Sequence, residues 1–263
     1  MTEKLENIIS SFEPITLQEM DSVKLMDRTD TKFVFQLGML PGILEEIKPF
    51  YRLLEINGTR CHRYESLYFD TDDFELYNSH HNGKLNRFKL RYRKYTDTNG
   101  LTFFEVKFKN NKDRTIKKRV KAEKISNGIS GKQEEFLRKI TPFSPEIFSP
   151  KLWVHYYRMT FVNKVLRERL TVDIGLNYAK PSSENLPHAV QVPQLVIAEA
   201  KREHAAMISP FIRALRRHAV RAGGISKYCF GIASLYEEVR KNTFKERISY
   251  IYKTINAPQS LAG

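Results

Sequence analysis

The stretch that decides the fold is residues 85–95, which read Leu-Asn-Arg-Phe-Lys-Leu-Arg-Tyr-Arg-Lys-Tyr. In a β-strand, successive side chains point to opposite faces of the sheet. One face of this strand would carry three apolar or aromatic side chains, and the other would carry four cations: Arg87, Lys89, Arg91 and Arg93. Because like charges this close repel one another, that face either lies open to bulk water or binds an anion.

The two segments that follow, residues 101–110 and 114–122, alternate in the same way between a largely apolar face and a face rich in cations. Four acids share the polar faces: Asp30, Glu105, Asp173 and Glu199. Two geometries are open. In the first, the polar faces point to solvent around a small sandwich. In the second, they line the inside of a barrel. The cations on predicted polar strand faces are Arg28, Lys32, Arg87, Lys89, Arg91, Arg93, Lys107, Lys109, Lys117, Arg119, Lys121, Arg167, Arg169 and Lys201.

The composition indicates a globular protein with an anionic partner. The chain has 263 residues, with 44 Lys and Arg against 30 Asp and Glu, so its formal charge is +14. Such an excess predicts binding to nucleic acid, an acidic membrane surface or a polyanionic small molecule. The two cysteines form no disulfide or zinc-binding pattern, and no signal peptide or apolar run of about 20 residues is present. These features favour the cytoplasm, with no membrane span in this chain.

The periodicity predicts an α+β fold in one domain over residues 1–263. A helical segment covers about 1–26, strands run from about 28 to 202, and C-terminal helices cover about 207–254. An Asn-Gly turn at 57–58 predicts a hairpin between strands 51–56 and 63–70. Residues 153–163 and 167–176 predict a second hairpin, followed by a polar loop to 193. Many antiparallel strands with short turns indicate a closed eight-stranded barrel, which leaves no exposed edge.

A barrel interior lined with Arg and Lys suits a chain of phosphates. Arginine forms forked hydrogen bonds to phosphate oxygens, and lysine supplies a compact charge. A few carboxylates among these cations would hold a divalent metal, which takes oxygen ligands and bridges phosphates. No Gly-x-x-x-x-Gly-Lys-Ser/Thr loop occurs in the chain, so the phosphates would not be held in that way.

An ordered set of short motifs resembles the VTC domain, the catalytic part of the vacuolar transporter chaperone complex and a member of the triphosphate tunnel metalloenzymes, which are CYTH-like. The motifs span about residues 28–230. They are Arg28-x-Asp30-x-Lys32-Phe33, Tyr68-Phe69-Asp70, Lys89-Leu90-Arg91-Tyr92-Arg93, Glu105-Val106-Lys107, Tyr157-Arg158, Arg169-Leu170-Thr171-Val172-Asp173, Ala198-Glu199-Ala200-Lys201 and Ser226-Lys227-Tyr228.

The resemblance implies an antiparallel tunnel surrounded by helices and an ATP-dependent polyphosphate polymerase. Such an enzyme moves the γ-phosphate of ATP onto a growing chain, with Mn²⁺ or Mg²⁺ as the cofactor. Glu199 would be the metal ligand. The implied catalytic phosphate ligands are Arg91, Arg93, Lys107, Arg158, Arg169 and Lys227. Further phosphate-binding residues would be Arg28, Lys32, Lys89, Lys117, Arg119, Lys121 and Lys201.

One departure from the related CYTH pattern keeps other functions open. Where that branch has Glu-x-Glu-x-Lys, this chain has Arg28-x-Asp30-x-Lys32, which favours a more cationic tunnel over a two-metal hydrolase. The alternatives are a metal-dependent inorganic triphosphatase or nucleoside triphosphatase and a non-catalytic polyphosphate-binding protein. The partners would be ATP, polyphosphate or inorganic triphosphate, and a membrane partner remains open. Nucleic acid is not expected, because alternation puts the aromatic side chains opposite the cations, whereas single-strand binders combine both in one groove.

Overall fold

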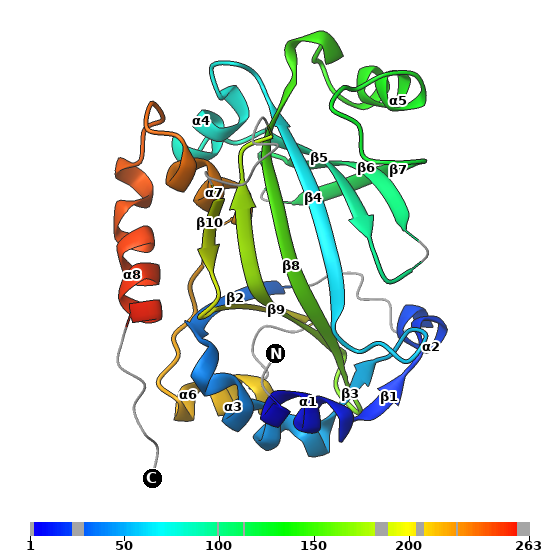
Figure 1. The fold of residues 1–263 in the computed structure, drawn as a ribbon, viewed down its shortest axis with the longest axis vertical. Coiled ribbons are helices and arrows are strands. Elements are labelled where there is room, and N and C mark those ends of the chain that lie inside the picture. Colours follow the sequence, from blue (N-terminus) through cyan, green and yellow to red (C-terminus); the bar gives the residue numbers. More distant parts are fainter. Residues whose placement is uncertain are drawn as a thin grey trace.

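The computed structural model describes residues 3–22, 29–98, 100–112, 114–181, 189–203, 208–224 and 226–256. Its centre is a strongly curved antiparallel sheet of eight strands in the order β2-β11-β9-β8-β4-β5-β6-β7 (Figure 1). These strands are β2 (Thr29–Gln36), β4 (His62–Asp70), β5 (Arg87–Tyr95), β6 (Leu101–Lys109), β7 (Thr115–Ala122), β8 (Ser149–Asn163), β9 (Glu168–Ala179) and β11 (Leu195–Arg202). The predicted α+β class and the opening strand, β5, are confirmed.

Three short strands extend this sheet and correct two expectations. They are β1 (Glu13–Ile15), β3 (Tyr51–Leu54) and β10 (Ala189–Val192). The Asn-Gly turn is confirmed by the bridge between Ile56 and Thr59, but the predicted pairing of the two strands around it is wrong, because β3 pairs with β1 and β8 instead of β4. The polar loop predicted up to residue 193 contains β10, which pairs with β9. The first error concerns the pairing of β3 with β8, a strand distant in sequence, which local turn signals do not report.

The sheet is not closed into a barrel by strand pairing, so this part of the prediction is wrong. The pairing path ends at β2 on one side and at β7 on the other. The edge of β2 that faces away from β11 pairs with the segment around Ala222. Phe33 forms a bridge with Ala222, and the Gly223 N–H donates to the Lys32 carbonyl at 2.8 Å. Since this segment takes the edge of β2 within the described chain, β7 has no strand to pair with on that side.

Helices pack on the apolar surfaces of the sheet. On the convex side, α1, α3 and α6 bury apolar side chains of β2, β8, β9 and β11, and α5 covers β5 and β6 (Figure 1). At one end of the concave side, α7 packs on Val34, Val154, Leu176 and Ile197. The helices are α1 (Glu3–Ser10), α2 (Leu17–Ser22), α3 (Leu40–Ile47), α4 (Glu75–His81), α5 (Lys132–Ile140), α6 (Pro210–Arg217), α7 (Lys227–Leu235) and α8 (Lys245–Asn256), with 3₁₀ turns η1 (Leu37–Met39), η2 (Lys48–Phe50), η3 (Pro145–Ile147) and η4 (Asn242–Phe244).

This arrangement leaves the rest of the concave face to charged side chains. Because side chains alternate along each strand, the residues between the apolar ones of β2, β9 and β11 point inward. In the described parts of the chain, no helix has the length and apolar character needed to cross a membrane. The concave face is therefore where we look for a functional site.

Candidate functional site

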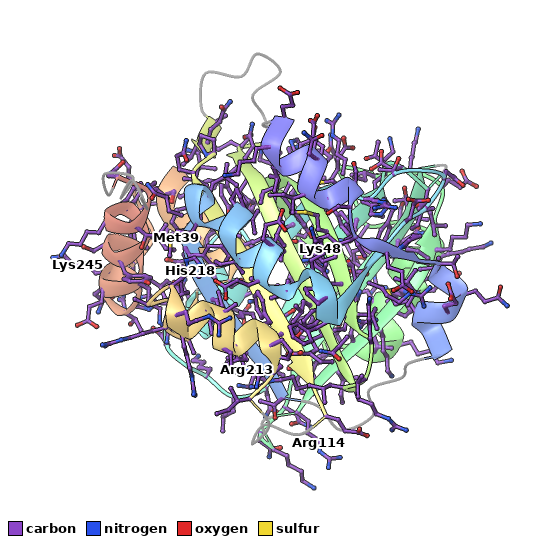
Figure 2. The ribbon with its side chains drawn as sticks, turned by 90° about the horizontal axis from the view of Figure 1, so that it is seen from below. Met39, Lys48, Arg114, Arg213, His218 and Lys245 are labelled. Carbon is purple, nitrogen blue, oxygen red and sulfur yellow. The ribbon has the colours of Figure 1, made fainter. Side chains whose placement is uncertain are left out.

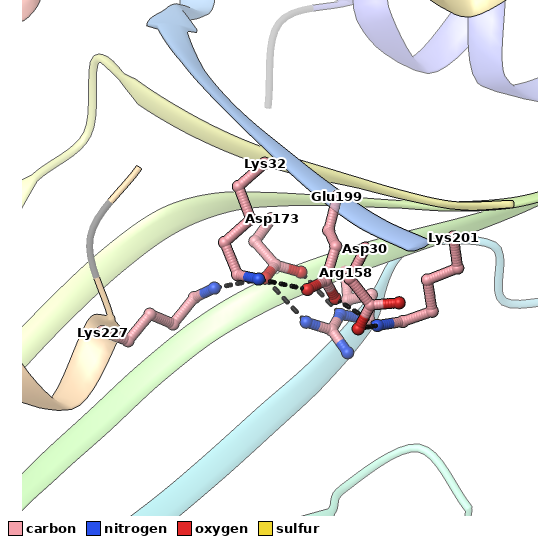
Figure 3. A network of polar contacts seen from close by, with 7 residues as sticks. All are labelled: Asp30, Lys32, Arg158, Asp173, Glu199, Lys201 and Lys227. Carbon is pink, nitrogen blue, oxygen red and sulfur yellow. Dashed lines mark hydrogen bonds and ion pairs between the residues drawn. The ribbon is translucent and has the colours of Figure 1, made fainter. Parts of the chain in front are cut away.

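Three carboxylates on the concave face each lie between two cations that come from different elements. We name these groups the Asp173 cluster (Asp173, Arg158, Lys227), the Glu105 cluster (Glu105, Arg91, Lys117) and the Glu199 cluster (Glu199, Lys32, Lys201, with Asp30 on Lys201). Figure 3 shows the Asp173 and Glu199 clusters side by side. All three bring together residues that the sequence singled out.

The Asp173 cluster is the most enclosed. Arg158 and Asp173 are register partners on β8 and β9, and the Arg158 Nε and Nη2 atoms donate to Asp173 Oδ1 and Oδ2 at 2.6 and 2.7 Å. Lys227 is the first residue of α7 and donates to Asp173 Oδ2. Burial disfavours the charged form of Asp173, but Arg158 and Lys227 outweigh it and lower the pKa of this carboxyl.

The Glu105 cluster joins β5, β6 and β7. The Arg91 Nε and Nη2 atoms donate to Glu105 Oε2 at 2.8 and 2.6 Å, and Lys117 contacts the other carboxylate oxygen. Arg91 also donates from Nη1 to the Tyr68 hydroxyl at 2.7 Å. Burial opposes ionisation of Glu105, yet Arg91, Arg93 and Lys117 lower its pKa. The glutamate therefore stays ionised and fixes the Arg91 side chain.

The Glu199 cluster lies between β2 and β11. Lys32 is the register partner of Glu199, and Asp30 is the partner of Lys201. The Lys32 and Lys201 ammonium groups each lie 2.6 Å from a Glu199 oxygen, and Lys201 also donates to Asp30 at 3.0 Å. Burial disfavours the Glu199 anion, but Lys201 and Lys32 outweigh it and lower its pKa. A carboxylate that stays ionised in this position is a suitable ligand for a hard cation.

Three further cations of strands β5 and β6, of which Arg93 is buried and Lys107 is exposed, have no carboxylate within ion-pair distance among the described residues. Lys89 donates to the Ser226 hydroxyl at 2.8 Å, and Arg93 donates to the Ser66 hydroxyl at 3.1 Å. Lys107 lies beside other cations: burial, followed by the charges of Lys89 and Lys32, lowers its pKa to about 8. These groups carry positive charge that no described acid neutralises by contact, which is the arrangement expected of an anion site.

Aromatic rings support the arginines of this face. Tyr64 and Tyr156 are stacked with centroids 5.2 Å apart, and the Arg93 and Arg158 guanidinium carbons lie 5.1–5.8 Å from both ring centroids. Contacts of this kind attract a cation to the ring face. Sequence reasoning missed Tyr64 and Tyr156 as site residues. The available signal was that Tyr156 and Arg158 share one strand face.

Residues on either side of position 225 contact two different strands of the sheet. Ala222 is paired with β2 at Phe33, and the Ser226 hydroxyl accepts from Lys89 of β5. Ser226 also caps α7 by accepting from the Cys229 N–H. Sequence reasoning placed Ser226 within a motif but not in the site, because its contact with β5 spans 137 residues of sequence.

Some predicted residues lie at the margin of this site or outside what is described. Arg119 is exposed and stacks on Phe103, with its guanidinium carbon 4.3 Å from the ring centroid, and Lys121 is exposed on β7. Arg169 is the register partner of Lys201. Arg28 lies outside the described residues, so its predicted role stays a prediction.

The basic helix α6 lies on a different face. Arg213 is seen from below in Figure 2, at the end of the molecule formed by α3 and α6. Arg213 and Arg216 are exposed, and the Arg217 Nε donates to Glu46 of α3 at 2.7 Å. The apolar side of α6 is buried in the core under the sheet. Its arginines therefore form a solvated helix face, separate from the concave site.

The carboxylates of the concave face fit a divalent metal only if phosphate oxygens complete the coordination of the metal. Within the described ranges, no group of three or more His, Cys, Asp or Glu side chains gathers in a way that could hold a metal ion. Glu199 offers carboxylate oxygens that are ionised but paired with lysines. Magnesium is commonly bound by one or two carboxylates together with substrate phosphates and water. The site thus fits a metal that arrives with a phosphate substrate.

Comparison with solved structures supports the fold. A putative adenylyl cyclase from Hippeastrum, described as having a dominant triphosphatase activity, has a TM-score of 0.52 and 12% identity, covering 79% of this chain and 96% of its own. A putative adenylate cyclase from Bacillus halodurans has a TM-score of 0.49 and 13% identity, covering 76% and 96%. At this identity, the first likeness shows the fold alone.

Comparison with sequences gives a family match. No curated protein matches this chain. The sequence model of the family described as the VTC domain matches residues 27–236, which include every residue of the three clusters.

Proposed function

Since the chain belongs to the VTC domain family, we propose that it is an ATP-dependent polyphosphate polymerase. Its substrates are ATP and a polyphosphate chain, and inorganic triphosphate is the shortest analogue of that chain. That residues 1–263 form one domain and that the protein works in the cytoplasm stay predictions, and the question of a membrane partner stays open.

The observation that carries this proposal is the charge on the concave face. Lys89, Arg93 and Lys107 have no carboxylate contact within the described chain, and they lie among cations that buried acids hold in place. A cationic surface enclosed by a sheet stabilises a polyanion more strongly than an exposed one, because the surrounding protein screens less than water. A chain of phosphates matches it in charge.

In the proposed reaction, an oxygen of the terminal phosphate of the chain attacks the γ-phosphorus of ATP. A new P–O bond forms, the bond between the γ-phosphorus and the β,γ-bridging oxygen breaks, and ADP leaves with the electron pair. Catalysis of such a transfer is mostly positioning and charge stabilisation. Arg91, Arg93 and Arg158 would hold the phosphoryl oxygens in line, together with Lys107, Arg169 and Lys227.

Glu199 would hold the metal ion, Mn²⁺ or Mg²⁺, which supplies charge neutralisation to the phosphates when bound. Lys32 and Lys201, which contact Glu199 in this structure, would then be released to phosphate oxygens. Lys89, Lys117, Arg119 and Lys121 would extend the cationic surface along the polymer, and Arg28 would add to it at the start of β2.

Incubation of the purified protein with ATP and Mn²⁺ tests the proposal. A polymerase forms acid-labile polymer that migrates as long chains on a urea gel, with ADP released in equal amount to the phosphate incorporated. Orthophosphate without polymer would contradict the polymerase and support a hydrolase. A mock purification from cells that lack the protein is the control for contaminating kinases.

A metal-dependent triphosphatase is the second candidate. The observation in its favour is that Asp30 and Glu199 share the ammonium of Lys201, which places two carboxylates beside each other. If Lys201 moved to a phosphate, both acids could contribute to metal binding, and the nucleophile would be water. Release of orthophosphate from inorganic triphosphate, with no polymer from ATP, would favour this reaction.

A further inference from the structure

We propose that Asp173 is a positioning residue, which holds the Arg158 guanidinium and the Lys227 ammonium together as one binding face for a single phosphate group. The inference deepens the proposed function and rests on it. In this role Asp173 does not contact the substrate. Asp173 fixes the positions of two cations that come from different secondary-structure elements.

The two cations would not lie together without an acid between them. Arg158 comes from β8, whereas Lys227 begins α7, a helix far along the chain. Both are positive and mostly removed from solvent, with side-chain exposures of 19% and 14%. Like charges in such a setting repel strongly. Asp173, with a side-chain exposure of 2%, contacts both groups and offsets that repulsion.

Arg158 and Lys227 each have N–H donors that Asp173 does not use. A guanidinium has five N–H donors, and the structure assigns the Arg158 Nε and Nη2 atoms to Asp173. An ammonium has three donors, of which Lys227 uses one for Asp173. The carboxylate therefore occupies only part of each cation, and the remaining donors can bind phosphate oxygens.

A tyrosine ring supports the same pair from a second side. The Lys227 Nζ atom lies 4.8 Å from the centroid of Tyr156, and the Arg158 Cζ atom lies 5.3 Å from it. The charged and titratable groups that face Lys227 are Asp173, Arg158, Tyr156 and Tyr68. Among these, Asp173 contributes most to raising the pKa of Lys227, with a smaller contribution from Tyr68, whereas burial and Arg158 lower it.

Asp173→Asn tests the proposal, because the amide keeps the size of the side chain and removes its charge. The measurement is the affinity for inorganic triphosphate by calorimetry, from pH 6.5 to 9.5, on the full chain. Asp70→Asn is the matched control: Asp70 is also a buried carboxylate, but it accepts from the backbone N–H groups of Leu76 and Tyr77 and from the Tyr228 hydroxyl.

We expect Asp173→Asn to weaken triphosphate binding about tenfold to a hundredfold, since the two cations lose their fixed geometry. Its affinity should also begin to fall at a lower pH than that of the unaltered protein, because Lys227 loses the charge that favours its protonated form. Asp70→Asn should lower the melting temperature without moving the pH at which affinity falls. A purely structural role for Asp173 would give the Asp70→Asn result.

Wild-type affinity and an unchanged pH profile in Asp173→Asn would overturn the inference. If that variant fails to fold, Asp173→Glu carries the test, because it keeps the charge but moves it by about one bond length. Reduced affinity with an unchanged pH profile would then support positioning, and wild-type affinity would overturn it. A protein that binds triphosphate but makes no polymer would refute the polymerase alone. Absence of triphosphate binding would refute both.

Discussion

The Asp173 and Glu199 clusters share one arrangement but differ in the type of cation and in exposure to solvent. Each places one ionised carboxylate between two cations on the concave face. Asp173 has a side-chain exposure of 2%, and its main partner is a guanidinium bound through two parallel hydrogen bonds. Glu199 has an exposure of 19%, and its register partner Lys32 is 41% exposed.

Because of this difference, Arg158 and Asp173 form a structural clamp, whereas Lys32 and Glu199 form a pair that can separate. A bidentate arginine–carboxylate contact fixes both geometry and charge, so Arg158 and Asp173 should stay together whether or not phosphate is present. A lysine is a flexible point charge, and Lys32 can leave Glu199 at small cost. A metal ligand must be able to exchange its partner, and of the two carboxylates only Glu199 is placed to do so.

Arg158→Ala should have the largest effect, because it removes one of the two cations that neutralise the buried Asp173 carboxylate. Removing one partner of a buried ion pair costs about 3–5 kcal/mol. The free energy of unfolding, measured by urea denaturation, should fall by that order. Arg63→Ala is the control, since Arg63 forms an exposed pair with Glu65 that contributes about 1 kcal/mol or less. Equal losses in both variants would contradict the clamp.

Glu199→Gln should preserve the fold and nucleotide binding but lower turnover by about a hundredfold or more, because the metal loses its protein ligand. Turnover with ATP and Mn²⁺ and nucleotide affinity without metal are the two measurements. Glu203→Gln is the control, because Glu203 contacts the exposed Arg167 instead of the concave face. Full activity in Glu199→Gln would remove the metal assignment.

Alkaline pH should weaken phosphate binding through Lys107 and Lys117. Burial is the first cause that lowers the pKa of Lys107 and of Lys117 to about 8. Both are charged below that pH and lose their protons above it, so affinity for triphosphate should fall by up to about tenfold per lysine between pH 8 and 9. Calorimetry in two buffers should show proton uptake on binding in this range. A constant affinity from pH 7 to 9.5 would contradict it.

Gly224→Ala should give the smallest effect, about fivefold weaker triphosphate binding, from crowding worth about 1 kcal/mol. An added Cβ atom at Gly224 would lie 3.1 Å from the Lys32 Cβ atom and displace that side chain. Gly223→Ala is the matched control, because nothing lies within 4 Å of its added Cβ atom. Identical affinities in the two variants would show that the position of Lys32 is not critical.

Much of the strand pattern was predictable because it depends on alternation, which is local. Segment 85–95 was expected to place Arg91 and Arg93 on the face opposite Leu90, and in β5 Arg91 turns to Glu105 while Leu90 is buried beneath α5. The strand pairing expected beyond the Asn57-Gly58 turn and the closed barrel were wrong. Both depend on the partner of a strand edge: β3 takes β8, and β2 takes the segment at Ala222.

The candidate site was predictable as a list of cations but not as contacts. Nothing in the spacing of Asp173 and Lys227, which are 54 residues apart, indicates that they touch. Tyr64 and Tyr156 were missed for the same reason, because their stacking requires β4 and β8 to be neighbours. Arg87, by contrast, is the first residue of β5, and it donates to the Lys84 carbonyl at 2.9 Å.

The sequence by itself determined the excess of positive charge, the positions of the strands and the residues that share each strand face. These follow from composition and from the two-residue period of a strand. Only the tertiary structure decided which face is concave, which acid neutralises which cation and which cations, such as Lys89, Arg93 and Lys107, are left without a carboxylate contact in the described chain. The reason is physical: pairing between distant strands and docking of α7 bring charges together across the sheet, and their energies depend on distance and burial that no local pattern contains.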